Sequence, residues 1–485
     1  MMKYDVVIIG SGLGGLVCGS LLARYGKSVL VLERQAQPGG CMQSYQRGGF
    51  SFDTGLHYIG GLAEGQRLHG IFSYLGLMKL PWVRLDADGF DLVTIGNDTF
   101  AFAEGHDRFV ETLAQHFPQE REGLQQYVSM LQQVDALSPT TDDAYQLFGT
   151  SAYQYLTSTF HDPLLVNVLS ATALKMELRQ ESLPLFTFAH GMSSFIGSSW
   201  RLRGSGQLLV NSLVNDIRRL GGEVICHADV NQLAEKEGRI VAAQCSNGEL
   251  YEGDMFISDA HPQVTFSWLD ESRLIKRMFR RRINAMENSF GMFTVSLVLK
   301  QGVLPYFNHN KYVYSKPDVW TFYNDTDSIG GLMVSCRVPE SGNDARQIDL
   351  MTPMPWTMCE PWKDTTVGHR GKEYEQLKDH LADECIHLAE RVIPGLQGMV
   401  EKRYTSTPLT YRDYSLTPCG SAYGVRKDWR SPLTTILSPR TPIPNLLLTG
   451  QSLMLHGVEG VTMTALRTCT EIVGKDYVNK ILTQI

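Results

Sequence analysis

The residues best suited to bind a ligand lie close to the start of the chain. Gly10, Gly12 and Gly15 have the spacing G-x-G-x-x-G, and the acid Glu33 follows them. Glycines in this arrangement let the backbone turn tightly and approach a pyrophosphate, and the acid can hydrogen-bond a ribose diol. The pattern predicts a dinucleotide site, and we expect the whole turn to contact the phosphates through Gly10, Gly12, Leu13, Gly14 and Gly15.

The elements around this turn are those that a dinucleotide-binding βαβ unit requires. Residues 5–10 form an apolar, mostly β-branched run that predicts a buried strand. Residues 16–25 predict a helix that ends at Gly26, and residues 28–33 predict a second strand with Glu33 at its end. The start of such a helix offers free N–H groups and a positive dipole end to a phosphate. A strand–turn–helix without a ligand is the alternative, and the complete order of strand, glycines, helix, strand and acid disfavours it.

A second glycine pair, Gly39-Gly40, follows shortly after Arg34. This extension resembles the fingerprint of FAD-containing oxidoreductases, in which the pair lets the chain pass close to the cofactor. Residues 49–60 (GFSFDTGLHYIG) and residues 420–424 (GSAYG) resemble segments of the retinol saturases. Retinol saturases belong to the family of phytoene desaturases, carotenoid isomerases and related flavoproteins, whose order of elements this chain matches along nearly its whole length.

The resemblance implies further contacts with FAD. The backbone of Val230, just after a strand predicted at 223–227, would meet the adenine. A strand at 444–449 and a helix at 457–473 would close the site from the C-terminal side, and the positive end of that helix would face the flavin. The cofactor-binding residues implied in this way are Arg34, Gly39, Gly40, Val230, Gly450, Gln451, Gly457, Gly460, Val461 and Thr462.

The fold class implied is α/β. It consists of a discontinuous Rossmann-type FAD-binding domain, similar to that of glutathione reductase, and an α+β substrate or cap domain. We expect the FAD-binding domain to comprise residues 1–67, 201–270 and 405–485, and the substrate domain to comprise residues 68–200 and 271–404. Helical periodicity dominates 68–200, at 106–116, 120–137 and 163–174.

The remaining segments are assigned as follows. In the cofactor domain we predict a helix at 207–220, a hairpin at 239–252 and a strand at 255–259. In the substrate domain we predict an antiparallel sheet from strands at 292–299, 311–314, 332–338 and 349–351, followed by a helix at 374–392.

Composition excludes several classes of protein. The 485 residues carry a net charge of −7, with 43% hydrophobic and 20% charged residues, which argues against a nucleic-acid binder. The nine cysteines include no CxxC pair, so we expect reduced thiols and no metal centre. The first apolar run is already the predicted strand, which argues against a signal peptide, and no run approaches the roughly 18 apolar residues of a membrane-spanning helix. We expect a cytoplasmic protein.

One basic stretch leaves peripheral membrane contact open. Residues 271–284 carry six cationic side chains among apolar ones: Arg273, Lys276, Arg277, Arg280, Arg281 and Arg282. Such a helix either lies on a membrane surface or presents a solvated face, and the solvated face is the more common case. An apolar lipid substrate, which must be taken from a bilayer, would favour membrane contact.

By resemblance we expect an FAD-dependent oxidoreductase acting on C=C bonds of an apolar polyene or isoprenoid-type substrate. Saturation is favoured, and desaturation and cis–trans isomerisation are alternatives. A non-catalytic lipid carrier, similar to the Rab GDP-dissociation inhibitors, is an alternative of another class, disfavoured because this chain keeps its glycines and Glu33. An amine oxidase shares the cofactor domain, but the segments 49–60 and 420–424 disfavour it.

The electron partner is left open by the sequence. Gly204-Ser-Gly206 lacks both the third glycine and a preceding strand, so only one complete G-x-G-x-x-G occurs and the chain has no built-in nicotinamide domain. NAD(P)H would therefore bind transiently, as an electron donor; a quinone, oxygen or another protein are the other options.

Three side chains near the expected flavin are candidates for carrying a proton: His57, Tyr58 and Tyr423. For His57, a structural hydrogen bond to a backbone carbonyl is at least as common as catalysis. A phenol with a pKa of about 10 needs help to donate a proton at neutral pH, so the two tyrosines are predicted rather to form pocket walls. We expect Cys41 to be a small buried side chain and Asp53 to fix a turn.

Overall fold

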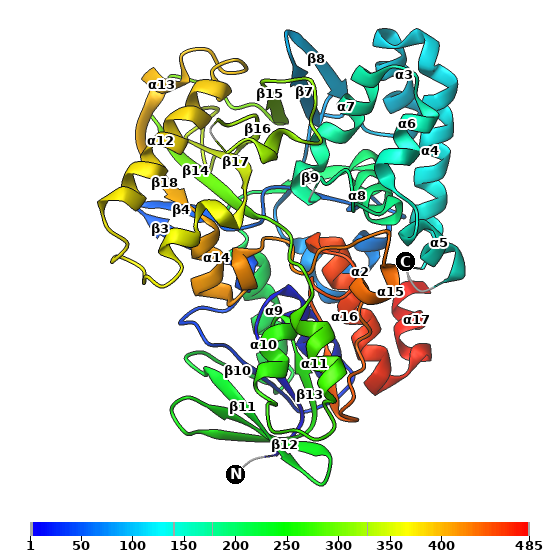
Figure 1. Ribbon diagram of the computed structural model, residues 1–485, viewed down its shortest axis with the longest axis vertical. Helices are drawn as coiled ribbons and strands as arrows, with labels where there is room; N and C mark the ends of the chain where they lie inside the picture. The colour runs from blue at the N-terminus through cyan, green and yellow to red at the C-terminus, as the bar shows by residue number, and fades with distance from the viewer. Residues whose placement is uncertain (1–2, 139–140, 177, 327, 484–485) are drawn as a thin grey trace.

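The computed structural model describes residues 3–138, 141–176, 178–326 and 328–483 (Figure 1). It begins with the predicted βαβ unit. β1 (Lys3–Ile9) leads through the glycine turn into α1 (Leu13–Arg24), and β2 (Val29–Leu32) returns parallel to β1. All four residues of β2 are buried, as the apolar run predicted.

The first large sheet collects strands from distant parts of the chain. Besides β1 and β2 it contains β10 (Glu223–Ile225), β11 (Val230–Lys236), β12 (Arg239–Cys245), β13 (Leu250–Ser258) and β19 (Leu446–Leu448). Its order is β10-β2-β1-β13-β12-β11, and β19 also pairs with β13. The pairs among β10, β2, β1, β13 and β19 are parallel, whereas β12 and β11 continue the sheet antiparallel. α1 contacts α9 (Gln207–Arg219) and α16 (Gly457–Val473), with which it shares one buried apolar cluster.

The second large sheet lies above the first one in Figure 1. Its strands are β7 (Asp91–Ile95), β8 (Asp98–Phe102), β14 (Gly291–Leu299), β15 (Asn310–Tyr314), β16 (Gly331–Cys336), β17 (Gln347–Met354) and β18 (Val400–Ser406). The order is β18-β14-β17-β16-β15-β7-β8, antiparallel except that β15 and β7 are parallel. α12 (Lys372–Ala389) contacts β15, β16 and β17.

A helical part, cyan in Figure 1, lies beside the second sheet. It comprises α3 (His106–His116), α4 (Arg121–Ala136), α5 (Asp142–Phe148), α6 (Ala152–Thr159), α7 (Pro163–Ala171) and α8 (Leu185–Gly197). α8 contacts α3, α4, α5 and α6, and most of its residues are buried. The short 3-10 turn η4 (Thr172–Met176) follows α7 and also contacts α8.

The remaining elements are short or peripheral. The strands are β3 (Ser44–Arg47), β4 (Phe50–Asp53), β5 (Ile59–Gly60), β6 (Trp82–Arg84) and β9 (Ser199–Leu202). The helices are α2 (Arg67–Leu75), α10 (Pro262–Ser267), α11 (Arg277–Asn284), α13 (Leu396–Met399), α14 (Pro408–Ser415), α15 (Pro432–Thr435) and α17 (Lys475–Thr483).

Three expectations of local structure are wrong. The region 68–200 is not only helical, because β7 and β8 form a hairpin whose turn contains Gly96 with a φ of +63°; this turn signal was overlooked. The strands predicted at 250–252 and 255–259 are one continuous strand, β13, because its parallel pairing with β1 and β19 extends the hairpin strand. The basic helix is shorter than predicted, since α11 begins only at Arg277. The domain boundaries stay a prediction.

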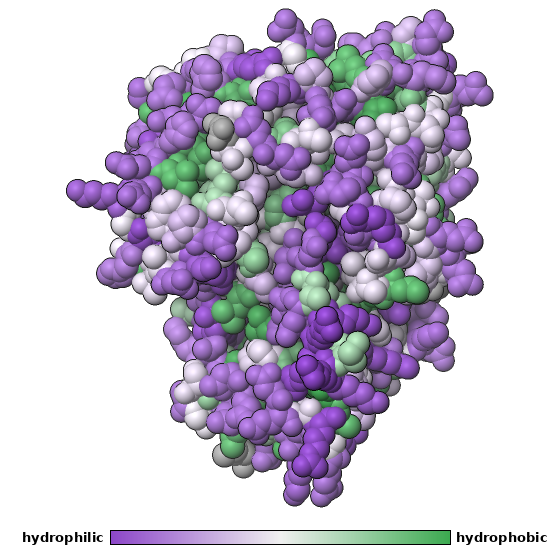
Figure 2. Space-filling model, viewed as in Figure 1, coloured by the Kyte–Doolittle hydropathy of each residue, from purple (hydrophilic) through white to green (hydrophobic). Residues whose placement is uncertain are grey.

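The surface of the viewed face is mostly hydrophilic, with apolar residues in small separate areas (Figure 2). Among the described residues, no helix combines the length and the apolar character needed to cross a bilayer.

Candidate functional site

A cavity of about 380 Å³ starts at the glycine turn after β1 and is lined by residues of both large sheets, α8 and η4. This volume lies within the ~300–1,000 Å³ of typical small-molecule sites. Most predicted site residues line it: Gly10, Gly12, Leu13, Gly14, Glu33, Arg34, Gly40, His57, Tyr58, Val230, Tyr423, Gly450, Gln451, Gly457, Gly460 and Val461. Residues far apart in the sequence therefore converge on one cavity.

Three predicted site residues, Gly15, Gly39 and Thr462, are not among the residues that line the cavity. A Cβ on Gly15 would lie 2.2 Å from the carbonyl oxygen of Gly10, so only glycine allows this turn to close. The N–H of Gly39 donates a hydrogen bond of 3.1 Å to Ser11 Oγ. Thr462 Oγ1 donates to the carbonyl of Val458 within α16. We expect these residues to shape the cofactor site without facing it.

The glycine turn forms a close-packed cradle. A Cβ on Gly12 would lie 2.4 Å from Asp259 Oδ2, and one on Gly14 would lie 3.0 Å from Gly450 Cα. Real Cβ atoms do not approach other atoms as closely as the first of these distances. The N-terminus of α1 thus lies directly against the loop after β19, and both cofactor-binding halves predicted from sequence meet at this point.

Asp259, at the end of β13, occupies the middle of the cradle. Its carboxylate accepts backbone hydrogen bonds from Gly12 and Gly15, and burial raises its pKa to about 7. The sequence signal for this residue is an acid directly after an apolar strand. We did not assign it to the site, because its approach to the glycine turn depends on the parallel pairing of β13 with β1.

This pKa predicts a pH dependence of cofactor affinity. As the pH rises through about 7, Asp259 ionises beside the expected pyrophosphate, and repulsion between the two anions weakens binding. We expect the affinity to fall by up to ~10-fold per pH unit above pH 7, the limit for one ionising group. Fluorescence titration of apoprotein with FAD between pH 6 and 9 measures this slope. Asp259→Asn keeps the size of the side chain and is expected to remove the slope; an equal slope in both proteins contradicts the prediction.

Glu33 is held at the end of β2. It is buried, with 7% of its surface exposed. Its Oε2 accepts hydrogen bonds from Ser11 Oγ and, at 3.2 Å, from Ser11 N, and its Oε1 accepts one of 2.7 Å from Gln35 N. These bonds fix both carboxylate oxygens at the cavity wall, where spare lone pairs can accept from a ribose diol.

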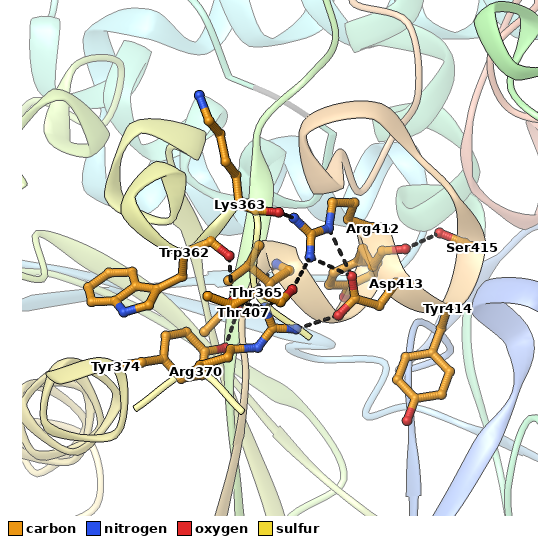
Figure 3. Close-up of polar contacts among 12 residues, drawn as sticks. Trp362, Lys363, Thr365, Arg370, Tyr374, Thr407, Arg412, Asp413, Tyr414 and Ser415 are labelled. Carbon is orange, nitrogen blue, oxygen red and sulfur yellow. Dashed lines mark hydrogen bonds and ion pairs between the residues drawn. The ribbon is translucent and has the colours of Figure 1, made fainter. Parts of the chain in front are cut away.

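Arg34 connects Glu33 to the far rim of the cavity. Its guanidinium donates to the backbone carbonyl of Asp413. The Asp413 carboxylate lies between Arg370 and Arg412 (Figure 3), accepting from Arg370 Nη2 and, at 2.8 Å, from Arg412 Nε. Arg412 also donates to the carbonyls of Lys363 and Thr365. This ionic cluster anchors α14, whose last two residues and the two that follow, residues 414–417, line the cavity.

The C-terminal half of the site is the start of α16. Glu459 lies in its first turn and accepts a 2.7 Å hydrogen bond from Ser194 Oγ of α8. His190 of α8 is 5% exposed, and its Nε2 lies 3.9 Å from Glu459 Oε1. Within the described part of the chain, neither ring nitrogen of His190 has a hydrogen-bond partner. A buried, unpaired imidazole in a cavity wall fits a site that a polar ligand completes.

Of the predicted proton carriers, His57 is the least suited to act as an acid. Its side chain is 13% exposed, its Nδ1 lies 3.8 Å from Asp349 Oδ2, and desolvation lowers its pKa to about 4. A group with this pKa is neutral at pH 7 and holds no readily released proton. Tyr423 packs its ring against those of Phe290 and His456. Both residues line the cavity, as predicted, and their catalytic roles stay a prediction.

Tyr58 belongs to a buried polar cluster that the sequence did not reveal. Its hydroxyl donates a 2.8 Å hydrogen bond to Asp91 Oδ2, lies 2.8 Å from the hydroxyl of Tyr312, and accepts a hydrogen bond from Lys175 Nζ. Burial raises the pKa of Tyr58 well above its usual value. The four members come from β7, β15, η4 and the segment before β5, so no local spacing connects them.

The described residues fit a dinucleotide cofactor. The glycine cradle leaves no room for side chains, Glu33 faces the cavity at the end of β2, and the N-termini of α1 and α16 both reach the cavity. Helix N-termini provide N–H donors and a positive dipole end for phosphate or for an electron-rich ring. Cys41 is half-buried and lines the cavity rather than being fully buried as predicted; desolvation raises the pKa of its thiol to about 11, which keeps it neutral at pH 7.

The chain is similar to known proteins in sequence and in fold. A family model described as an NAD(P)-binding Rossmann-like domain matches residues 8–75. The all-trans-retinol 13,14-reductase of Danio rerio is 25% identical to this chain and covers 97% of it, with 86% of the reductase aligned. The chloroplastic prolycopene isomerase of Daucus carota is 27% identical and covers 87% of the chain, with 72% of the isomerase aligned. The resemblance to this group of proteins, first seen in two short segments, is thus confirmed along most of the chain.

A solved structure of a putrescine oxidase double mutant superposes with a TM-score of 0.68 at 14% identity, covering 98% of this chain and all of the oxidase. At this identity the likeness concerns the fold alone. The expected fold class, a Rossmann-type α/β domain combined with further mixed α/β structure, is confirmed.

Proposed function

We propose that this protein is an FAD-dependent oxidoreductase that acts on C=C bonds of an apolar polyene or isoprenoid-type substrate, with saturation as the favoured reaction. One observation carries the proposal: the dinucleotide cradle opens into the same cavity as an apolar wall. That wall consists of Leu174, Phe195, Met292, Met333 and Met351. A polyene offers no polar group along its chain, so an apolar wall with unbranched methionines suits it. The names of the two relatives support this substrate class.

The roles of the residues follow from this arrangement. The glycine cradle, Glu33 and the start of α16 would hold FAD, and bound FAD supplies hydride exchange between its flavin ring and carbon. The apolar wall orients the substrate and excludes water. The chain itself must still supply or remove one proton, and we include His57, Tyr58 and Tyr423 among the side chains that face the reaction.

The alternatives use the same site. Desaturation and cis–trans isomerisation need the same cofactor and the same apolar wall. A non-catalytic lipid carrier would need the wall but not the cradle, and the close packing around Gly12 and Gly14 supports cofactor binding instead. We propose NAD(P)H as a transient electron donor, since the chain has one dinucleotide motif.

The visible spectrum of the purified protein tests the proposal. We expect flavin absorption bands that bleach when dithionite or NAD(P)H is added anaerobically, and that return when a polyene substrate is added. The reductant that acts identifies the donor. A colourless protein that also fails to take up added FAD would exclude the enzyme and favour the lipid carrier.

Peripheral membrane contact remains a proposal with a defined test. α11 exposes Arg277, Arg281 and Arg282 together with Met278, which is 72% exposed, whereas Ile283 is buried. Because Ile283 is buried and the exposed side chains are mainly cationic, the helix offers charge rather than an inserting face. We therefore expect weak binding to anionic vesicles, lost at high salt, and none to neutral vesicles. Co-sedimentation measures it, and no binding to anionic vesicles at low salt removes the proposal.

A further inference from the structure

We propose that Lys175 is the catalytic acid of this site and protonates one carbon of the substrate double bond. The inference rests on the proposed function. In the saturation reaction bound FAD, once reduced, would supply a hydride equivalent to one carbon, and Lys175 Nζ donates a proton to the neighbouring carbon. The π bond is lost and two C–H bonds form. Lys175 is left as a neutral amine and regains its proton from water, and the two electrons come from a donor such as dithionite or NAD(P)H.

Lys175 is placed to act on a ligand in the apolar part of the cavity. It lies in η4 and lines the cavity between Leu174 and Met176. Its side chain is 13% exposed. The Nζ atom lies 3.6 Å from the centre of the Phe195 ring and donates a hydrogen bond to the hydroxyl of Tyr58. A lysine ammonium with so little access to water is costly, and it needs polar partners to persist.

The direct polar partners of Lys175 come from β7 and from the segment before β5. Asp91 Oδ2 of β7 lies 3.7 Å from Nζ, and Tyr58 bridges the two groups. Tyr312 of β15 hydrogen-bonds Tyr58, and Asn310 donates a 2.8 Å hydrogen bond to Asp91. The buried cation Arg201 of β9 bonds the side-chain oxygen of Asn310 at 2.7 Å.

The balance of these forces sets the ionisation of Lys175. Burial lowers its pKa, the charge of Asp91 opposes that shift, and the result is a pKa of about 8. A group with a pKa close to the operating pH is protonated yet releases its proton readily, which is the optimum for general acid catalysis.

Four other titratable side chains of the cavity are less suitable. Burial lowers the pKa of His57 to about 4 and that of His456 to about 3, so both are neutral at pH 7. It raises the pKa of Tyr58 well above 10. Asp259 has a suitable pKa, but it lies in the glycine cradle, where the phosphates are expected. Tyr58 is therefore a positioning residue for Lys175.

Electrostatics favour the same assignment. Delivery of a hydride equivalent to a conjugated polyene places negative charge on the neighbouring carbons. An ammonium group in a site without water stabilises that charge far more than it would in solution. Lys175 thus both stabilises the developing charge and quenches it with a proton. The reverse reaction, desaturation, needs the neutral amine as base, so its rate would rise with pH where that of saturation falls.

Rapid-mixing kinetics on the flavin-loaded protein test the proposal. Enzyme reduced beforehand is mixed anaerobically with a polyene, and reoxidation of the flavin is followed. We expect Lys175→Met to slow this step at least ~100-fold, the lower range for loss of a general acid. Reduction of the flavin by dithionite should stay unchanged. In the unsubstituted protein the reoxidation rate should fall above pH 8, and product formed in D₂O should carry one solvent deuterium.

Two further variants test whether a slower reaction of Lys175→Met could result from misfolding instead of the loss of the acid. Lys175→Arg keeps the charge and length of the side chain, but its guanidinium does not release a proton, so we expect it to be as slow as Lys175→Met. Lys372→Met, at an exposed lysine of α12, is the matched control and should behave like the parent. A readout that does not depend on catalysis is trace acetylation followed by peptide mass spectrometry. It should give a midpoint near pH 8 for Lys175, below the ~10.4 of an unperturbed lysine side chain.

The possible outcomes distinguish the role of Lys175 from the proposed function of the protein. An unchanged reoxidation rate and an unchanged alkaline limb in Lys175→Met overturn the role of Lys175 and leave the proposed function intact. A parent protein whose reduced flavin no polyene reoxidises overturns both. An acetylation midpoint for Lys175 at the ~10.4 of an unperturbed lysine contradicts the ionisation on which the acid role depends.

Discussion

Substitution of valine for Gly12 is expected to give a folded protein that has lost its dinucleotide cofactor. The new Cβ would lie 2.4 Å from Asp259 Oδ2, and the branched side chain would fill the cradle that a pyrophosphate needs. We expect FAD affinity to fall at least ~100-fold, which corresponds to about 2.8 kcal/mol at 1.4 kcal/mol per factor of ten. The flavin content after dialysis and a fluorescence titration of the apoprotein measure this loss.

Two glycine variants provide the comparison. The clash at Gly12 is with a side chain, whereas a Cβ on Gly15 would meet the backbone oxygen of Gly10 at 2.2 Å, so Gly15→Val should also lower the melting temperature of the apoprotein. Among the described residues, no atom beyond the local backbone lies within 4 Å of a Cβ on Gly398, and Gly398→Ala is expected to change neither property. A Gly12→Val protein that retains flavin as well as the Gly398 variant does would refute the cradle as the phosphate site.

The sequence predicts those parts of the structure that depend on local order. β1, α1 and β2 lie where the apolar run, the glycines and Glu33 place them, because each is specified by neighbouring residues. The start of α16 at Gly457 and its end before Gly474 follow for the same reason. Resemblance to a known family then added the C-terminal half of the cavity, which local pattern alone does not connect to the first half.

What the sequence could not supply is contact between distant segments. Asp91 and Lys175 belong to the region 68–200, in which helical periodicity dominates the sequence, and each looks ordinary in its local surroundings. They meet because β7 pairs with β15 and η4 lies against α8. A buried charged residue can be identified only when its partner is known. The sequence alone therefore does not single out Lys175, because its partner Asp91 is brought close by the order of the strands.

Asp413→Ala is expected to destabilise the protein by about 3–5 kcal/mol, the usual cost of removing one partner from a buried ion pair. The Arg370 side chain is only 6% exposed, and its charge would lose the carboxylate that it contacts. Arg412 shares that carboxylate, so two cations would be left facing each other (Figure 3). Chemical denaturation followed by circular dichroism measures the loss, provided that the transition remains two-state.

We expect the loss of stability to depend on how deeply the ion pair is buried. A second ion pair, exposed to solvent, provides the comparison. Asp88 and Arg108 form an ion pair with side chains 94% and 53% exposed, and Asp88→Ala should cost at most ~1 kcal/mol. Asp413→Asn keeps the hydrogen-bond acceptor but not the charge, and should fall between the two. Arg34, which follows Glu33 in the sequence, donates a hydrogen bond to the backbone carbonyl of Asp413. We therefore also expect Asp413→Ala to weaken FAD binding where Glu33 is expected to contact the ribose. Equal losses for Asp413→Ala and Asp88→Ala would show that the cluster contributes no more than surface charge, and the rim would then be held by the backbone contacts of α14 alone.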